Sequence, residues 1–220
     1  MQKAYELLVF DWDGTLMDSE SRIVNCMRAT ITDLGLELPD DSSISNIIGL
    51  GLKEAICMLF PGADDALVQS VIGRYRHHFL FENTTPTPLF SGAKEVLHEL
   101  KSEGYLLAVA TGKGRPGLDR VLDITGLNQV FHATRCADEA FSKPHPDMLL
   151  QLLDELGVQP ADALMIGDTE YDMQMANNAG TAALAVSYGV HSMDRLLQHG
   201  PLGCLGAITE VSDWLSGKPL

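Results

Sequence analysis

The chain is short of basic residues and of long apolar runs, and each shortage excludes a class of protein. Fifteen Lys and Arg stand against 30 Asp and Glu, so the formal net charge is −15 at pH 7. Nucleic acids and anionic membranes are bound through basic patches, so we expect neither as a partner. No apolar run approaches the roughly 20 residues that a membrane-spanning helix needs.

Cysteine is also scarce. The four cysteines, Cys26, Cys57, Cys136 and Cys204, are widely spaced and form no C-x-x-C pair. This spacing favours reduced thiols over a disulfide framework or a zinc site, and each cysteine is expected to be a small core residue. An apolar stretch already begins at Leu7, which leaves no room for a signal peptide. We therefore expect a cytoplasmic protein, as a monomer or a weak homodimer.

What the chain does contain is an alternation of strand and helix patterns. Its 220 residues are 45% hydrophobic, enough for one large domain or a domain with an insertion. Because strands that alternate with helices form βαβ units, we predict a doubly wound, Rossmann-like α/β sheet. The predicted strands are 7–10, 106–110, 130–134, 163–166, 182–186 and, weakly, 205–208, and the predicted helices are 93–101, 116–124, 146–156, 171–179, 193–198 and 209–215.

Residues 18–88 have a different pattern. Apolar residues such as Ile23, Met27 and Ile31 recur there at helical spacing, and Gly and Pro residues separate about four such stretches. We therefore predict an α/β core of residues 1–17 and 89–220, interrupted by a helical domain of residues 18–88. The pair His77-His78 is expected on an outer helical face, because no third metal ligand accompanies it.

Two carboxylates follow the first predicted strand. The segment Leu7–Phe10 is apolar on both faces, as in a central parallel strand, and runs directly into Asp11, Asp13, Gly14 and Thr15. Asp11 and Asp13 are two residues apart on an extended chain and should point the same way, so their repulsion calls for a cation. Mg²⁺ is suited to such a pair, although Asp and Gly are also ordinary turn residues.

Three further polar groups follow strands or adjoin them. Thr111-Gly112-Lys113 ends a strand and offers a hydroxyl and an N–H to phosphate oxygens, or simply caps a helix. Lys143 lies in a proline-bracketed loop, where it is either a surface lysine or a fixed cation. Asp168 ends another strand, and Asp172 follows one turn later, unless the first merely caps a helix.

The order of these segments resembles the four motifs of haloacid dehalogenase-type phosphatases. The resemblance implies that Asp11 is the nucleophile and that Asp13 is the general acid and base. It also implies that Asp11, the Asp13 backbone carbonyl and Asp168 bind Mg²⁺. Thr111, the Gly112 N–H and Lys143 then hold the phosphoryl oxygens. Thr15 and Asp172 would have supporting roles. Asp172 would orient Lys143 or a metal-bound water.

The helical insertion is similar in position to the cap of the phosphoglycolate phosphatase and β-phosphoglucomutase branch of this superfamily. Such caps close over the site and contribute specificity. The segment Ile48–Glu54 is the candidate substrate loop of the cap. Gly49 and Gly51 would allow it to bend, and Lys53 would bind a substrate carboxylate or second phosphate, or would simply be solvated.

Several activities remain open within the resemblance. A Mg²⁺-dependent phosphatase acting on a small phosphorylated metabolite through an aspartyl phosphate is favoured, with a pyrophosphatase or a β-phosphoglucomutase-like phosphotransferase as alternatives. The mutases usually carry a histidine where this chain has Ile23, and they lack a threonine at the position of Thr15; both departures favour hydrolysis. A non-catalytic phosphate-binding regulatory module is a second alternative, although the residues Asp11, Asp13, Lys143 and Asp168 are all present.

Overall fold

The computed structural model describes residues 3–217, which form a six-stranded parallel sheet flanked by helices on both faces. The strand order is β3-β2-β1-β4-β5-β6. This order confirms the predicted doubly wound α/β fold. The strands are β1 (Leu7–Phe10), β2 (Leu106–Thr111), β3 (Ala133–Cys136), β4 (Ala163–Gly167), β5 (Ala182–Val186) and β6 (Cys204–Leu205).

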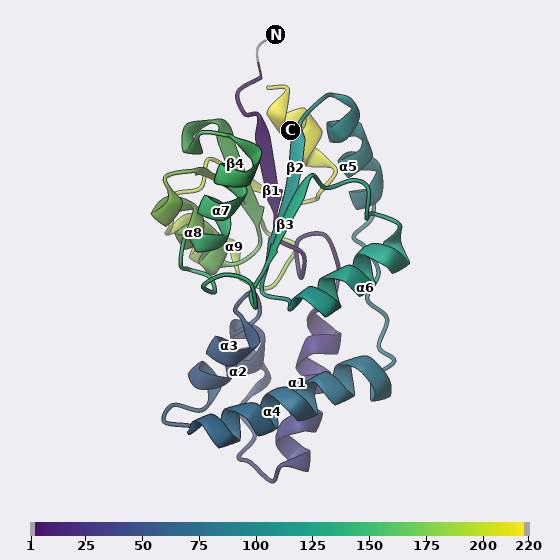
Figure 1. The fold of residues 1–220 in the computed structure, drawn as a ribbon, viewed down its shortest axis with the longest axis vertical. Helices are drawn as coiled ribbons and strands as arrows, with labels where there is room; N and C mark the ends of the chain where they lie inside the picture. Colours follow the sequence, from purple (N-terminus) through teal and green to yellow (C-terminus); the bar gives the residue numbers. More distant parts are fainter. Residues whose placement is uncertain (1–2, 218–220) are drawn as a thin grey trace.

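The helices that pack against the sheet form two layers, one on each of its faces (Figure 1). Leu8 and Phe10 of β1 pack into the apolar cluster on one face, with α5, α6 and α10. Leu7 and Val9 pack into the cluster on the other face, with α7, α8 and α9. The helices are α5 (Ala93–Ser102), α6 (Arg115–Thr125), α7 (Asp147–Leu156), α8 (Glu170–Ala179), α9 (Met193–Leu197) and α10 (Glu210–Leu215), with a short 3-10 helix η2 (Pro160–Asp162) before β4.

The segment between β1 and α5 is helical and lies beyond one end of the sheet, at the bottom of Figure 1. Its own apolar cluster includes Met27, Ile31 and Val71. We refer to this helical segment as the cap. That it forms a separate domain bounded by residues 18 and 88 is a prediction from the sequence. Its helices are α1 (Glu20–Asp33), α2 (Asp41–Asn46), α3 (Leu52–Leu59), α4 (Asp65–His77) and the π-helix η1 (His78–Glu82).

Three local predictions were wrong. The third strand was predicted at 130–134, but it begins at Ala133, because Val130 closes a turn onto the Leu127 carbonyl and reaches the core from there. Cys57 is exposed on α3, and Cys204 is half-buried, so only the other two cysteines are core residues.

His78 is buried rather than on an outer face, because Asp33 at the end of α1 and Glu82 of η1 both contact its ring, whereas His77 is exposed. Within residues 3–217, no helix is both long and apolar enough to cross a membrane.

Candidate active site

The carboxyl edge of the sheet gathers residues from β1, β2 and β4. The register aligns Phe10 of β1 with Val109 of β2 and with Ile166 of β4. Asp11, Thr111 and Asp168 follow these positions, so they come to the same edge although they lie far apart in the sequence. All three are buried.

A cluster of carboxylates stands at this edge. Asp11, Asp168 and Asp172 each place an oxygen within 4.8 Å of the other two, the one such group of possible metal ligands among residues 3–217. The loop before α7 brings Lys143 to the same place. Its Nζ lies 2.8 Å from Asp11 Oδ1 and 2.6 Å from Asp172 Oδ1, and all of these side chains are buried.

Asp168 and Asp172, at the start of α8, have different hydrogen-bond partners. Asp172 accepts from Lys143 and, on its other oxygen, from the backbone N–H and the hydroxyl of Thr169, which caps α8. Asp168 accepts one hydrogen bond on each oxygen, from the Thr15 hydroxyl at 2.7 Å and from the Val190 N–H at 2.8 Å. Asp172 therefore fixes Lys143, while both Asp168 oxygens keep a lone pair for a further ligand.

Burial and mutual repulsion set the electrostatics of the cluster. Burial raises the pKa of Asp11 well above its usual range; Lys143 opposes this rise, and Asp172 and Asp168 add to it. Burial and the Asp172 charge raise the pKa of Asp168 to about 7. Burial alone would lower the pKa of Lys143, but the charges of Asp11 and Asp172 outweigh it and raise the value. The cluster thus lacks positive charge.

The missing charge fits a divalent cation. Three carboxylates face one ammonium, which leaves two negative charges unbalanced, and Oδ2 of Asp11 is buried without a hydrogen-bond partner in the described chain. Carboxylate oxygens are the ligands that Mg²⁺ prefers. Asp11 and Asp168 have the free lone pairs for such an ion, whereas the contacts of Asp172 point to a positioning role.

Asp13 points to the same side as Asp11 but has its own partners. Its Oδ1 lies 2.8 Å from Lys113 Nζ and accepts a hydrogen bond of 2.5 Å from the Ser19 hydroxyl. Neither Lys113 nor Ser19 was predicted to have a role. The signal for Lys113 was its place directly after Thr111 and Gly112 at the end of β2; nothing in the sequence marked Ser19.

Gly14 allows Asp168 to lie close to the loop that follows β1. Its φ is +83°, a conformation that residues with a side chain rarely adopt. A Cβ at this position would also lie 2.1 Å from Asp168 Oδ2. The glycine after Asp13 is therefore required both by the turn and by the carboxylate opposite it.

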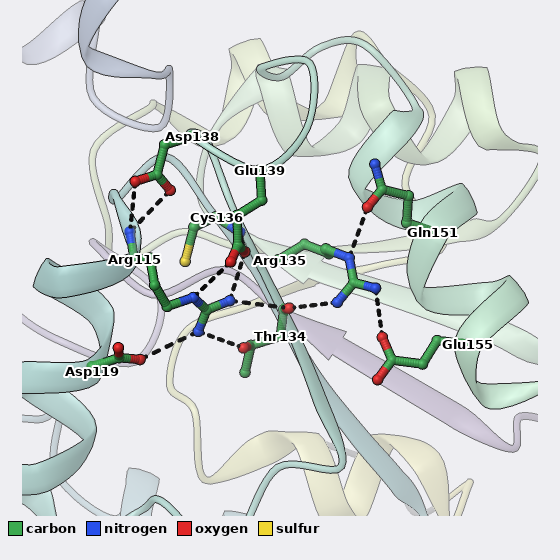
Figure 2. Close-up of polar contacts among 9 residues, drawn as sticks. All are labelled: Arg115, Asp119, Thr134, Arg135, Cys136, Asp138, Glu139, Gln151 and Glu155. Carbon is green, nitrogen blue, oxygen red and sulfur yellow. Dashed lines mark hydrogen bonds and ion pairs between the residues drawn. The ribbon is translucent and has the colours of Figure 1, made fainter.

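The loop after β3 clamps the start of α6 (Figure 2). Asp138 accepts from the backbone N–H of Arg115, which begins α6, at 2.9 and 3.1 Å. The Arg115 guanidinium binds Glu139 through Nε at 2.8 Å and Nη2 at 2.6 Å, and it also donates to Thr134. Ala137 N–H closes the clamp by donating to the Lys113 carbonyl. These contacts fix the backbone on either side of Gly114.

The predicted cap loop lies directly over the site. Gly51 donates its N–H to the Ser142 hydroxyl at 2.7 Å, beside Lys143. Gly49 has a φ of +100°, so the predicted bend is present. A Cβ on Gly112 would lie 2.4 Å from the Leu50 carbonyl oxygen, so the loop packs against Gly112. The cap is closed on the core in this structure.

The space between cap and core is a cavity of about 560 Å³. Asp11, Asp13, Gly112 and Lys113 face it from the core, and Lys53 lines it as an exposed residue. Thr111 is buried behind this surface, where its hydroxyl accepts from the Lys113 N–H at 3.2 Å and keeps its own proton for a ligand. The predicted core residues thus share one site, with Lys53 at its margin.

The parallel sheet, with paired carboxylates at its carboxyl edge, defines a doubly wound α/β enzyme. The model of the haloacid dehalogenase-like hydrolases matches residues 8–186, most of the chain. The chain therefore belongs to this family, as the four motifs predicted.

Three similar proteins are named for phosphatase activities. The chain is 35% identical over 209 residues to a protein of Dickeya dadantii named "Probable phosphatase IndB", covering 93% of this chain and 91% of that protein. It is 29% identical to a 5'-nucleotidase of Pseudomonas aeruginosa (90% and 89% covered) and 28% identical to a phosphoglycolate phosphatase of Rhodospirillum rubrum (94% and 90%). The predicted enzyme class, a phosphatase of this family, is confirmed.

The fold has solved counterparts. A haloacid dehalogenase-like hydrolase of Bacteroides fragilis superposes with a TM-score of 0.88 at 25% identity, covering 94% of this chain and 99% of that one. The likeness extends over cap and core together, so the helical insertion is part of the shared fold.

Proposed function

We propose that this hydrolase is a Mg²⁺-dependent phosphatase that transfers the phosphoryl group of a small monoester to Asp11 and then to water. One observation carries the proposal. Asp11 is buried in the cavity wall with one oxygen beside Lys143 and the other without a partner, which is the arrangement an attacking carboxylate needs.

Different side chains of the protein carry out the separate steps of the reaction. The Asp11 carboxylate attacks phosphorus while the bond to the leaving oxygen breaks, and Asp13 donates a proton to that oxygen. Asp13 then takes a proton from the water that attacks the aspartyl phosphate. Lys143, the Thr111 hydroxyl and the Gly112 N–H hold the phosphoryl oxygens.

The metal would be held by Asp11, the Asp13 carbonyl oxygen and Asp168. When bound, Mg²⁺ supplies positive charge against the phosphoryl oxygens. Thr15 and the Val190 N–H hold Asp168 toward this place, and Asp172 holds Lys143. The cap lies over the site, and such a cover would limit the access of bulk water.

The test is hydrolysis of p-nitrophenyl phosphate with Mg²⁺ and with EDTA. We expect turnover that requires Mg²⁺, that Asp11→Asn abolishes, and that Asp13→Asn or Asp168→Asn reduces severely. Asp41→Asn, an exposed residue of the cap, is the matched control. Mass spectrometry of the acid-quenched enzyme should find one phosphoryl group on Asp11. Binding of Mg²⁺ and phosphate without turnover would favour the regulatory module instead.

A phosphotransferase is less well supported, because Ile23 faces the cavity where a mutase usually has a histidine. Water is then the acceptor that Asp13 can activate. The free state of all four cysteines supports a cytoplasmic location, and a site complete within one chain supports a monomer or a weak homodimer.

A further inference from the structure

The cap also touches the core at Asn46, the last residue of α2. The Asn46 side-chain oxygen accepts a hydrogen bond of 2.5 Å from Nη1 of Arg195 on α9. Its carbonyl oxygen accepts from the Tyr171 hydroxyl of α8 at 3.0 Å and lies 3.4 Å from Nε2 of His191. Core residues from separate segments therefore converge on one residue of the cap. We call this group, Asn46 with Tyr171, His191 and Arg195, the cap dock.

The dock supplies donors to a helix end. The last carbonyl groups of a helix have no partner within that helix, so they need donors from elsewhere. The ring of His191 is one donor: its Nδ1 accepts from the Glu170 N–H at 3.0 Å, which places the ring proton on Nε2, toward Asn46. The Tyr171 hydroxyl is another. The Asn46 carbonyl keeps these donors only while the cap is closed on the core.

Arg195 is oriented for its contact with the cap. Its Nη2 forms an ion pair with Glu170. Hydrogen bonding from Arg195 lowers the pKa of Glu170 to about 2, so this carboxylate is ionised at neutral pH. A guanidinium presents its nitrogens in a fixed planar fork, so the pair with Glu170 aims Nη1 at Asn46. A lysine, with a single ammonium nitrogen, cannot hold both partners in this geometry.

The dock lies at one end of the loop that covers the site. Asn46 directly precedes the loop 47–51, whose far end donates to the Ser142 hydroxyl of the core. Leu50 of the loop packs with Tyr171 in a small buried apolar cluster. The loop is therefore fixed to the core at both ends and through an apolar contact between them.

The dock and the lysine proposed to hold the phosphoryl group share one turn of α8. Glu170, Tyr171 and Asp172 are consecutive residues of this turn. The first two make contacts of the dock, and Asp172 accepts from Lys143 at 2.6 Å. Because these residues stand on a single helical turn, the dock sets the position of the loop 47–51 relative to Lys143 itself.

From these contacts we propose that Asn46 and Arg195 are positioning residues of the phosphatase reaction, which hold the loop 47–51 closed over the cavity. The residues that line the cavity at Asp11 include neither of them, so they act through the loop. This inference rests on the proposed phosphatase function and adds the residues that set the closed position of the cap.

Hydrogen exchange at the Gly51 amide, followed by NMR, tests the closed position directly. This N–H donates to Ser142 on the core, so it is protected only while the loop is docked. We expect Arg195→Met and Asn46→Ala each to speed its exchange about five- to tenfold, the factor for one hydrogen bond to a charged group at a partly exposed position. Arg195→Lys should recover little of the protection.

Two controls separate docking from folding and from charge. The Phe60 amide donates to the Ile56 carbonyl within the cap, so its exchange reports on the folding of α3 and should not change. Arg120→Met removes the same charge from an exposed position on α6 and should leave both amides at the wild-type rate.

Kinetics with p-nitrophenyl phosphate and Mg²⁺ then test the link to the reaction. We expect Arg195→Met and Asn46→Ala each to lower kcat/KM about five- to tenfold, and Arg120→Met to keep the wild-type value. The double variant Asn46→Ala/Arg195→Met should match the slower single variant within about twofold, because both substitutions remove the same contact.

Unchanged Gly51 exchange in both variants would overturn the inference. Equal acceleration at Gly51 and Phe60 would do so too, because the cap would then be unfolding rather than undocking. Faster Gly51 exchange with wild-type kcat/KM would show that the dock does not serve the reaction, and would also overturn it. A wild type that does not hydrolyse p-nitrophenyl phosphate would instead contradict the proposed function, and Gly51 exchange would still decide whether Asn46 and Arg195 hold the loop.

Discussion

Lys113 Nζ lies 2.8 Å from Asp13 Oδ1, so a lysine that lines the cavity forms an ion pair with the predicted proton donor. Lys113 holds the Asp13 carboxylate toward the cavity, and the Ser19 hydroxyl supports the same oxygen. Arg115 and Glu139 clamp the start of α6 (Figure 2), and the Ala137 N–H donates to the Lys113 carbonyl, so the backbone from which Lys113 extends is fixed. The proton donor is thus oriented by a lysine in the loop after the neighbouring strand β2.

We predict that Lys113→Met lowers kcat/KM about 10- to 100-fold. This factor corresponds to the free energy of one charge-assisted hydrogen bond. The variant leaves Asp13 with Ser19 as its side-chain partner and removes a cation that faces the anionic substrate. Lys113→Arg should recover part of the loss, and Lys101→Met, on the surface of α5, should have no effect. Equal kcat/KM for Lys113→Met and the wild type would contradict the role.

Lys143 should be essential for stability as well as for activity. Lys143→Met leaves three buried carboxylates without their cation, and we predict a loss of about 3–5 kcal/mol in the free energy of unfolding. Urea denaturation in EDTA measures it. The double variant Lys143→Met/Asp172→Asn should lose less than the sum of the single variants, because one of the unpaired charges is gone. Strict additivity would show that the two side chains are not coupled.

The contact of the cap loop with Gly112 predicts that Gly112→Ala displaces the cap. The new Cβ would meet the carbonyl oxygens of Leu50 and Gly49 at 2.4 and 2.8 Å, and backbone atoms cannot yield locally. We expect kcat/KM to fall about 10- to 100-fold, with faster proteolysis of the loop 47–51. Gly73→Ala, in open space on α4, should keep full activity and gain about 1 kcal/mol of stability.

Glu139 should make stability depend on acidic pH. Its hydrogen bonds to Arg115 lower its pKa, although burial opposes them. The folded state therefore binds fewer protons than the unfolded state in this range. The stability that Glu139 contributes is present above its ordinary pKa of about 4.3 and is lost as pH falls through the lower folded value.

The corresponding measurement is the urea midpoint of Glu139→Gln between pH 7 and pH 3. The variant should be less stable than the wild type at pH 7, and the difference should shrink as pH falls below about 4. Glu155→Gln is the matched control, because Glu155 makes a single, more exposed contact with Arg135 (Figure 2). A pH-independent difference would exclude the ion pair as the cause.

Most strands and helices could be predicted from the chain because their patterns are local. The failures have a local cause in one case and a distant partner in another. Val130 is apolar like a strand residue but belongs to a turn, and His78 is buried because Asp33 stands opposite it. Cys57 is small and apolar like a core residue, but its side chain on α3 is exposed.

By itself, the sequence determined the edge of the sheet where the chemistry gathers. Buried strands run in parallel, so the polar residues that follow Phe10, Ala110 and Gly167 must meet at one rim. The tertiary structure alone decided which of these groups pair, because an ion pair depends on side-chain reach across strands and loops. The contact between Lys113 and Asp13, the closure of Leu50 over Gly112 and the docking of Asn46 on Arg195 all arise from elements that only the fold brings together.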